Sequence, residues 1–320
     1  MPNLLEIKDY SVGFQADQHR VYNLLDTISL SIAEGKSIGV VGESGCGKSM
    51  TSLSIMRLLP QSMIVQSGEI SYNGKDLLLL SDKDMQELRG KEIAMIFQEP
   101  MTSLNPVLTI GFQVGEVLRR HYPKMNKEEI EAAVIEQLGM VGIPNPQKCL
   151  SQYPHQFSGG MRQRAMIAMA SICHPRLLIA DEPTTALDVT IQAQVLDLLS
   201  NLKQIGSLML ITHNLGVVAE VCAEVVVMYA GQVVEKGRLE DIFDHPSHPY
   251  TVGLMASIPT LASEKRELYS IPGAVPSLES FNHGCRFADR CEKVLKQCPG
   301  QRPPSKALSA THEVTCWLDF

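Results

Sequence analysis

A stretch near the start of the chain has the residue types and the spacing that bind phosphate. Residues 42–49 read Gly42-Glu43-Ser44-Gly45-Cys46-Gly47-Lys48-Ser49 and fit the pattern G-x-x-x-x-G-K-[ST] in full. The glycines let the backbone curl so that its N–H groups point at phosphate oxygens. Lys48 can reach the β- and γ-phosphates of a nucleotide, and Ser49 can bind Mg²⁺. We expect this loop and the next residue, Met50, to hold a nucleotide.

The alternative for this stretch is a glycine-rich turn without a ligand. The predicted context speaks against it, because a strand precedes the loop and a helix follows it. The amino end of a helix adds partial positive charge where the phosphates would lie.

A pair of acids follows an apolar run later in the chain. The run Leu177-Leu178-Ile179-Ala180 leads directly into Asp181 and Glu182, so a strand here would bring both carboxylates to the carboxyl edge of a sheet. Asp181 can hold Mg²⁺, directly or through water, and Glu182 can polarise the attacking water as a general base. The alternative is that the two acids only end a strand in solvent. The presence of a phosphate-binding loop in the same chain makes this alternative weaker than a nucleotide-binding role.

The elements that must position these residues follow from hydrophobic periodicity. Strands are predicted at residues 4–14, 28–33, 37–41, 67–72, 93–97, 177–180, 207–212 and 225–229. A helix should begin at Lys48 and run to about Leu59, where Pro60 ends it. Alternating strands and helices favour a mainly parallel α/β sheet.

The chain divides into two predicted domains. Residues 106–170 read as an inserted helical subdomain, with periodic stretches at 107–120, 127–140 and 159–172. After about Ser257 the periodicity weakens and Pro and Gly become frequent. We therefore predict a main domain over residues 1–257 and a C-terminal extension over residues 258–320.

Composition argues against two classes of protein. The 320 residues carry a net charge of −7, which disfavours a free-standing nucleic-acid binder. No apolar run approaches the roughly 18 residues that a membrane-spanning helix needs. The first residues include Glu6, Lys8 and Asp9 where a signal peptide would be apolar. We expect a protein of the cytosol that can dock on a membrane protein.

A third motif, at residues 157–162, resembles a sequence signature of a known family. Phe157-Ser158-Gly159-Gly160-Met161-Arg162 lies upstream of the acidic strand and resembles the LSGGQ signature of ABC ATPases. The resemblance implies that Ser158, Gly159 and Gly160 bind the γ-phosphate of ATP held by the opposite subunit. Two glycines permit a close backbone approach, and the helix that follows directs its amino end at the phosphate. The sequence departs from the common form at Phe157 and Met161.

Other positions resemble further ABC elements, in the expected order along residues 4–257. Gln98 resembles the glutamine that senses Mg²⁺ and nucleotide, Asp188 the D-loop aspartate, and His213 the histidine that contacts the γ-phosphate. Phe14 lies where the family places an aromatic ring on adenine, with Tyr22 as the less favoured candidate. The resemblance implies a P-loop NTPase fold of the ABC type, with a RecA-like core, an antiparallel β-subdomain and a helical subdomain.

Several stretches are similar to one group within this family. Residues 245–251, HPSHPYT, and the segment Gly284-Cys285-Arg286-Phe287 with Arg290-Cys291 and Cys298 resemble ATPases of oligopeptide, dipeptide and nickel importers. Residues 98–106, QEPMTSLNP, and the signature segment 157–162 also resemble this group. This resemblance implies the D-type ATPase subunit, which energises import on the cytoplasmic side of the membrane. Its implied partners are two transmembrane permease subunits, an F-type paralogue or a second copy, and indirectly an extracytoplasmic solute-binding protein.

Four of the eight cysteines lie close together near the end of the chain. Cys285, Cys291, Cys298 and Cys316 are spaced C-x₅-C-x₆-C-x₁₇-C. Four thiolates can hold an iron–sulfur cluster or a tetrahedral zinc ion. The resemblance implies a [4Fe–4S] cluster with a structural role, while zinc and free thiols stay open. Cys46, in the phosphate-binding loop, reads as a space-filling residue with possible sensitivity to thiol reagents.

These observations together predict an ATPase that powers import of a small solute, with peptides favoured. ATP closes two subunits onto each other, and hydrolysis, assigned to Lys48, Glu182 and His213, reopens them. A soluble ABC ATPase that acts on ribosomes or DNA is one alternative, and a metal-sensing regulatory module is another. Which solute is carried, and whether the ATPase dimer has one or two kinds of subunit, are left open by the sequence.

Overall fold

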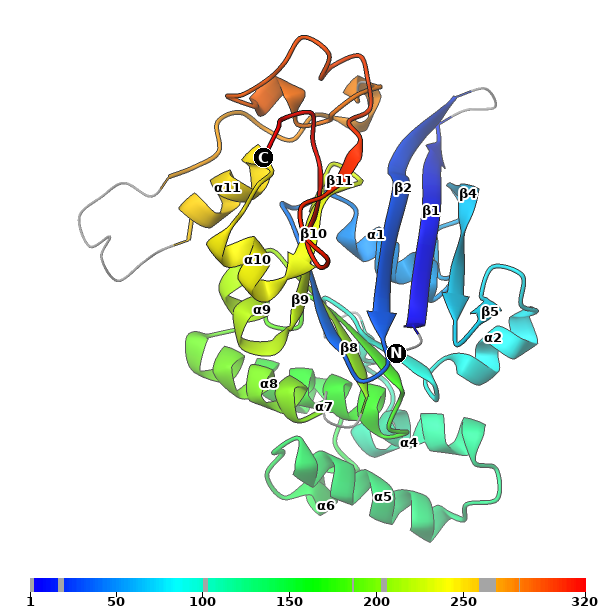
Figure 1. The fold of residues 1–320 in the computed structure, drawn as a ribbon. Helices are drawn as coiled ribbons and strands as arrows, with labels where there is room; N and C mark the ends of the chain where they lie inside the picture. Colours follow the sequence, from blue (N-terminus) through cyan, green and yellow to red (C-terminus); the bar gives the residue numbers. More distant parts are fainter. Residues whose placement is uncertain are drawn as a thin grey trace. The chain divides into compact units, whose positions relative to one another are not determined.

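The computed structural model describes residues 3–16, 20–99, 103–185, 187–202, 206–258, 269–281 and 283–320 (Figure 1). Contacts divide the chain into two compact units. The first unit comprises residues 1–32, 37–78 and 211–320, and the second comprises residues 33–36 and 79–210. The C-terminal extension thus belongs to the same unit as the N-terminal strands and the phosphate-binding loop.

An antiparallel sheet occupies the N-terminal part of the first unit. Its strands follow the order β2-β1-β4-β5, with bounds β1 Asn3–Gln15, β2 Val21–Ala33, β4 Met63–Tyr72 and β5 Lys75–Asp76. Leu5 pairs with Tyr72, and the register shifts between Lys8 and Ser11. Apolar side chains such as Leu5 and Ile70 are fully buried, so one face of this sheet supplies core.

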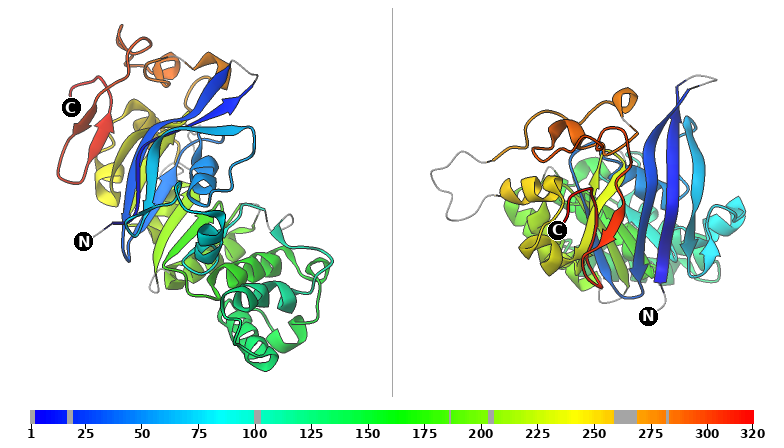
Figure 2. Two further views of the ribbon diagram at one scale, coloured as in Figure 1. Left: turned by 90° about the vertical axis from the view of Figure 1, so that its right-hand side faces the viewer. Right: turned by 45° about the horizontal axis from the view of Figure 1, so that its top comes forward.

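The remaining strands of the first unit follow the order β11-β12-β10-β9-β3. β3 (Ser37–Val41) is parallel to β9 (Glu224–Tyr229), and β9 is antiparallel to β10 (Gln232–Arg238). The short hairpin β11 (Ser305–Ala307) and β12 (Glu313–Thr315) extends the sheet beyond β10 (Figure 2). The last segment of the chain therefore adds strands to a sheet that contains β3.

Short helices complete the first unit. They are α1 (Lys48–Ile55), α9 (Leu215–Val221), α10 (Leu239–Asp244) and α11 (Pro249–Ala256), with single 3₁₀ turns η3 (Leu278–Ser280) and η4 (Ala288–Arg290). α1 is shorter than predicted. Its C-cap is Met56, and Arg57 then adopts a left-handed backbone with φ of 50°, which ends the helix before Pro60.

The second unit combines a small parallel sheet with helices. β6 (Ile93–Ile96) pairs in parallel with β7 (Leu177–Asp181), and β8 (Ser207–Thr212), which begins in this unit, follows β7 in the strand order. The helices are α2 (Asp82–Leu88), α4 (Ile110–His121), α5 (Lys127–Met140), α6 (Pro146–Cys149), α7 (Gly159–Ser171) and α8 (Val189–Leu202), with the 3₁₀ turn η1 (Pro154–Gln156).

Polar caps set where the helices of the second unit begin. Thr109 accepts a hydrogen bond from the N–H of Phe112 at the start of α4. Asn126 and Glu129 form a reciprocal capping box at the start of α5, and Ser158 caps α7. α4 packs against both α5 and α7. No helix among the described residues is long and apolar enough to cross a membrane.

Candidate functional site

The phosphate-binding loop leaves the buried strand β3 and enters α1. A side chain at Gly42 would place its Cβ 2.1 Å from the carbonyl oxygen of Met228, so only glycine fits beside β9. Gly47 is the N-cap of α1 and has a left-handed φ of 99°. The predicted strand, loop and helix are therefore all present around residues 42–49.

Lys48 lies along the inside of this loop. Its residue is only 4% exposed, and its ammonium group donates to the carbonyl oxygens of Gly42, at 2.7 Å, and Glu43, at 3.0 Å. A lysine held this way is prepositioned, because its charge already faces the loop that would surround a phosphate. Ser49 follows at the first turn of α1, half-buried.

Cys46 is fully buried within the same loop. Its Sγ lies 3.7 Å from the Lys48 ammonium, and burial raises the pKa of the thiol above its ordinary value. A raised pKa leaves less thiolate at neutral pH and so lowers reactivity toward thiol reagents. We therefore keep the interpretation of Cys46 as a space-filling residue.

Two contacts hold Glu43, and sequence reasoning missed both. The backbone N–H of Glu43 donates to the Tyr250 hydroxyl at 2.9 Å, and its carboxylate forms a two-pronged ion pair with Arg290 at 2.6 and 3.1 Å. Tyr250 lies in the HPSHPYT stretch and Arg290 directly precedes Cys291. Both residues thus lie in segments that the sequence analysis had singled out. No sequence pattern near either residue indicated a contact with the phosphate-binding loop.

The second unit carries the acidic pair at the end of β7. Asp181 is 3% and Glu182 9% exposed, and Glu182 has a left-handed φ of 46°. The Glu182 carboxylate accepts hydrogen bonds from the Gln98 amide at 3.1 Å and from the Thr185 hydroxyl at 2.8 Å. The structure therefore brings Gln98 and Glu182 together, and Thr185 joins them without having been predicted.

The signature segment forms the start of α7 in the second unit. The Ser158 hydroxyl accepts from the N–H of Met161, and Ser158 and Gly159 are exposed. A Cβ at Gly159 would meet nothing within 4 Å, whereas one at Gly160 would lie 3.2 Å from Ile191. In the same unit, exposed Asp188 accepts from the N–H of Ile191 at 3.0 Å, ahead of helix α8.

The remaining predicted nucleotide contacts lie in the first unit. Phe14 and Tyr22 are both half-buried, in β1 and β2 respectively, so both rings stay candidates for contact with adenine. His213 directly follows β8 and is exposed, and Asn214 after it caps α9.

The four late cysteines line one small pocket of the first unit, together with Phe287, Pro303 and Trp317. Cys285, Cys298 and Cys316 are buried and Cys291 is half-buried. Burial, and then the neighbouring thiols of the other three, raise the pKa of Cys285 to about 12. No three His, Cys, Asp or Glu side chains among the described residues are placed so that they could hold one metal ion.

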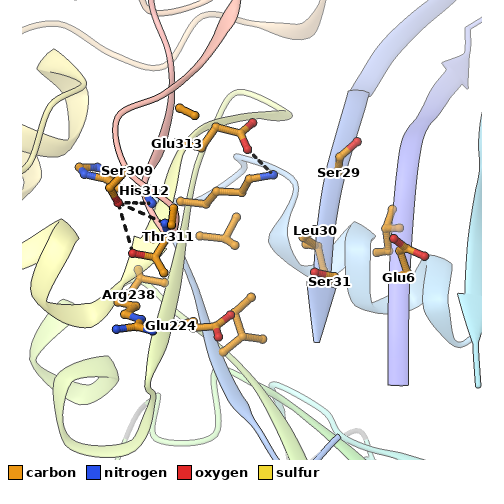
Figure 3. A pocket seen from close by; sticks show the side chains of 18 of the residues that line it. Glu6, Ser29, Leu30, Ser31, Glu224, Arg238, Ser309, Thr311, His312 and Glu313 are labelled. Atoms are coloured by element: carbon orange, nitrogen blue, oxygen red, sulfur yellow. Dashed lines mark hydrogen bonds and ion pairs between the residues drawn. The ribbon is translucent and has the colours of Figure 1, made fainter. Parts of the chain in front are cut away.

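A larger pocket of about 450 Å³ opens elsewhere in the first unit (Figure 3). It lies among β1, β2, β9, β10 and the segment before β12, and none of the predicted site residues lines it. Its charges are of both signs and partly paired, as in the 3.1 Å ion pair of Lys236 with Glu313 and the 2.9 Å pair of Lys8 with Glu6. This mixture does not suit a polyphosphate.

Comparison with known proteins gives two family matches. Residues 25–185 match the family described as ABC transporter, and residues 234–298 match the oligopeptide/dipeptide transporter C-terminal region. The second match spans the predicted boundary at residue 257 and ends before the last of the four cysteines.

Individual relatives match almost the whole chain. The Bacillus subtilis oligopeptide transport ATP-binding protein OppD is 51% identical over 98% of this chain and 88% of its own. The dipeptide transport ATP-binding protein DppD of the same organism is 50% identical over 99% and 95%. Among solved structures, a dimeric ATP-binding cassette in a post-hydrolysis state with ADP and Pi aligns with a TM-score of 0.66 and 26% identity, over 73% of this chain and 98% of that one.

Proposed function

The chain belongs to the ABC transporter family of ATP-binding proteins, and on that premise we propose that it hydrolyses ATP to energise the import of peptides. One observation carries the peptide assignment. The similarity to peptide-transport subunits runs through nearly the entire chain, including the C-terminal region that matches the oligopeptide/dipeptide transporters. Nickel and other solutes are the alternatives within the wider group.

We propose that residues 42–50 bind the triphosphate of ATP. Lys48 would exchange its two loop carbonyl partners for the β- and γ-phosphate oxygens, and the backbone N–H groups of the loop would take the remaining oxygens. Ser49, Asp181 and Gln98 offer the hydroxyl, carboxylate and amide oxygens that Mg²⁺ prefers. A bound Mg²⁺ neutralises charge on the phosphates.

Glu182 and His213 are the residues that we assign to hydrolysis. Glu182 would orient and polarise the attacking water, and its hydrogen bonds to Gln98 and Thr185 already restrict where the carboxylate can point. His213 would contact the γ-phosphate, and exposure on the turn after β8 leaves it accessible for that contact.

A second ATPase subunit would complete the site. Ser158, Gly159 and Gly160 would cover the ATP held by the other subunit, with the amino end of α7 directed at the γ-phosphate. The exposure of Ser158 and Gly159 and the open space at Gly159 support this role. The similar solved cassette is itself described as a dimer. The other subunit would be an F-type paralogue or a second copy of this chain.

The helical part of the second unit offers a docking surface for the permease. A groove there is lined by apolar and charged side chains, among them Phe112, Met125, Ile130, Val134, Leu150, Arg119, Lys127 and Glu131. Phe112 is 46% exposed, and Tyr122 is 37% exposed. We propose that transmembrane permease subunits dock here, which would hold the chain on the cytoplasmic face of the membrane.

Co-expression with the permease and the partner ATPase tests this function. We expect the complex to co-purify, and its ATP hydrolysis to rise when peptide and the solute-binding protein are added. Phe112→Glu should lose the permease while keeping the ATP affinity of the isolated chain within about twofold, because its side chain is partly exposed and the groove that it lines contains none of the predicted nucleotide contacts. Leu79→Glu, at a residue that is 84% exposed in the same unit, is the matched control.

Two outcomes would count against the peptide-import proposal, and a third against the docking surface. Capture of ribosomes or DNA in place of permease would favour the soluble ATPase. Stimulation by nickel and not by peptide would change the solute. Equal permease binding by wild type and Phe112→Glu would remove the docking surface.

For the four late cysteines we propose a [4Fe–4S] cluster with a structural role. All four thiols line a single pocket, which suits a group bound by four cysteines. Zinc also takes four thiolates, so the match of this segment to the oligopeptide/dipeptide transporter C-terminal region, together with the shared pocket, is what favours the cluster.

Iron and sulfide analysis of protein purified without oxygen tests the cluster. We expect brown protein with about four irons and four sulfides per chain, and Cys285→Ser should lose both the colour and thermal stability. Cys222→Ala, at a buried cysteine outside this pocket, is the control and should keep the iron. Stoichiometric zinc, or metal-free protein of unchanged stability, would overturn the proposal.

A further inference from the structure

The C-terminal extension contacts Glu43, the second residue of the phosphate-binding loop. Arg290 forms the two-pronged ion pair with Glu43, the residue that directly follows Gly42. The Arg290 side chain is 5% exposed and that of Glu43 29%. Parallel hydrogen bonds from a guanidinium fix the carboxylate in direction as well as in distance, which a single surface ion pair does not.

Arg290 is itself anchored on several sides. Its guanidinium also donates to the carbonyl oxygens of Pro272, at 2.9 Å, and Ile271, at 3.2 Å, and to the Tyr229 hydroxyl at 3.3 Å. A side chain with this many fixed acceptors loses little further freedom by holding Glu43. The ion pair therefore ties the loop to a rigid support.

A second contact reaches the same loop residue from the same side. Tyr250 is fully buried, and its hydroxyl accepts the backbone N–H of Glu43. Phe287 packs on the rings of Tyr229 and Tyr250, with centroids 5.1 and 5.4 Å apart. Phe287 and Arg290 both lie between Cys285 and Cys291, so the cysteine-lined segment supports both contacts to Glu43.

The loop backbone at these positions also carries the partners of Lys48. The carbonyl oxygens of Gly42 and Glu43 accept from the Lys48 ammonium. Contacts that hold the backbone and carboxylate of Glu43 therefore also hold the carbonyl oxygens that position the Lys48 ammonium. Preorganising a binding loop raises affinity because less ordering is needed when the ligand arrives.

We infer that Arg290 is a positioning residue for nucleotide binding, through which the C-terminal extension holds the phosphate-binding loop in its binding shape by way of Glu43. This inference rests on the proposed ATP-binding function of the loop. It gives the extension a role in ATP affinity that is separate from docking or from peptide choice.

A double-mutant cycle on Arg290 and Glu43 tests the inference. We expect Arg290→Gln and Glu43→Gln each to raise the Kd for MgATP about fivefold, and the double variant to raise it by about the same factor and not by the product. For Arg290→Gln, KM for ATP should rise in parallel while kcat at saturating ATP stays within about twofold, since Arg290 contacts Glu43 and is not assigned to the nucleotide. Arg290→Lys keeps the charge but cannot form two parallel hydrogen bonds to a carboxylate. Its Kd for MgATP should lie between those of wild type and Arg290→Gln.

Glu313 supplies the matched control. It lies in the same extension, in β12, and its partly exposed carboxylate pairs with Lys236 of β10 at 3.1 Å. Glu313→Gln should therefore leave the Kd for MgATP unchanged. Thermal unfolding of each variant separates loss of fold from loss of positioning, and Glu43→Gln tests the contact from the exposed side should Arg290→Gln prove unstable.

The outcomes separate this inference from the proposed function. Failure of the wild-type protein to bind MgATP would contradict the proposed function. Wild-type binding with additive effects in the cycle, or with unchanged affinity in both single variants, would overturn the role of Arg290 alone.

Discussion

Replacing Glu182 by glutamine should give a protein that binds MgATP as well as wild type and hydrolyses it at least about 100-fold more slowly. Glutamine keeps the size of the side chain and can still bond to Gln98 and Thr185, but it cannot accept a proton from water. The left-handed backbone at Glu182 is unaffected by this exchange, so the fold should be retained. Phosphate release under steady-state conditions, beside equilibrium binding of MgATP, measures the two effects.

The exposed acid Asp197 on α8 offers a control for this variant. Asp197→Asn removes one carboxylate from the same unit and should hydrolyse ATP at the wild-type rate. Rapid steady-state hydrolysis by Glu182→Gln would refute the assignment of Glu182. Loss of MgATP binding by the same variant would move its role from chemistry to nucleotide affinity.

Replacing Gly159 by aspartate should stop turnover while leaving the isolated subunit folded and able to bind ATP. The position is exposed, a Cβ added there would meet nothing within 4 Å, and an acid in the first turn of α7 is favourable to the helix. In the proposed dimer, however, the new carboxylate would meet the γ-phosphate of the other subunit's ATP. We expect hydrolysis to fall about 100-fold or more, because charge repulsion and bulk both oppose closure.

Gly159→Ala separates bulk from charge in this experiment. A methyl group should cost far less than the carboxylate, and thermal unfolding should show both variants as stable as wild type. Measurement requires the assembled ATPase dimer, with ATP binding to the isolated chain as the internal reference. Wild-type hydrolysis by the Gly159→Asp dimer would mean that α7 does not face a γ-phosphate.

Local patterns were enough to predict several elements to the residue. The strands at residues 37–41 and 207–212 and the helix at residues 127–140 have the predicted bounds. Each is set by its own side chains: the strands are buried throughout, and the helix is fixed by the capping box of Asn126 and Glu129. The family assignment follows equally directly, since its motifs are contiguous in the sequence.

Contacts between distant segments could not be predicted in this way. Glu43 meets Tyr250 and Arg290 across more than 200 residues, and no pattern near any of the three indicates the others. The hairpin of β11 and β12 was likewise missed, because three-residue strands are too short to show alternation and are defined by pairing with β10. The early end of α1 depends on the backbone of Arg57, a residue with no preference for it.

The account depends on a division of labour between a loop that holds the triphosphate and an acid that acts only in hydrolysis. Equilibrium binding of MgATP to folded Lys48→Ala and Glu182→Gln, measured side by side with wild type, tests that division most directly. We predict that Lys48→Ala loses binding while Glu182→Gln retains it. Equal binding by Lys48→Ala and wild type would contradict the account.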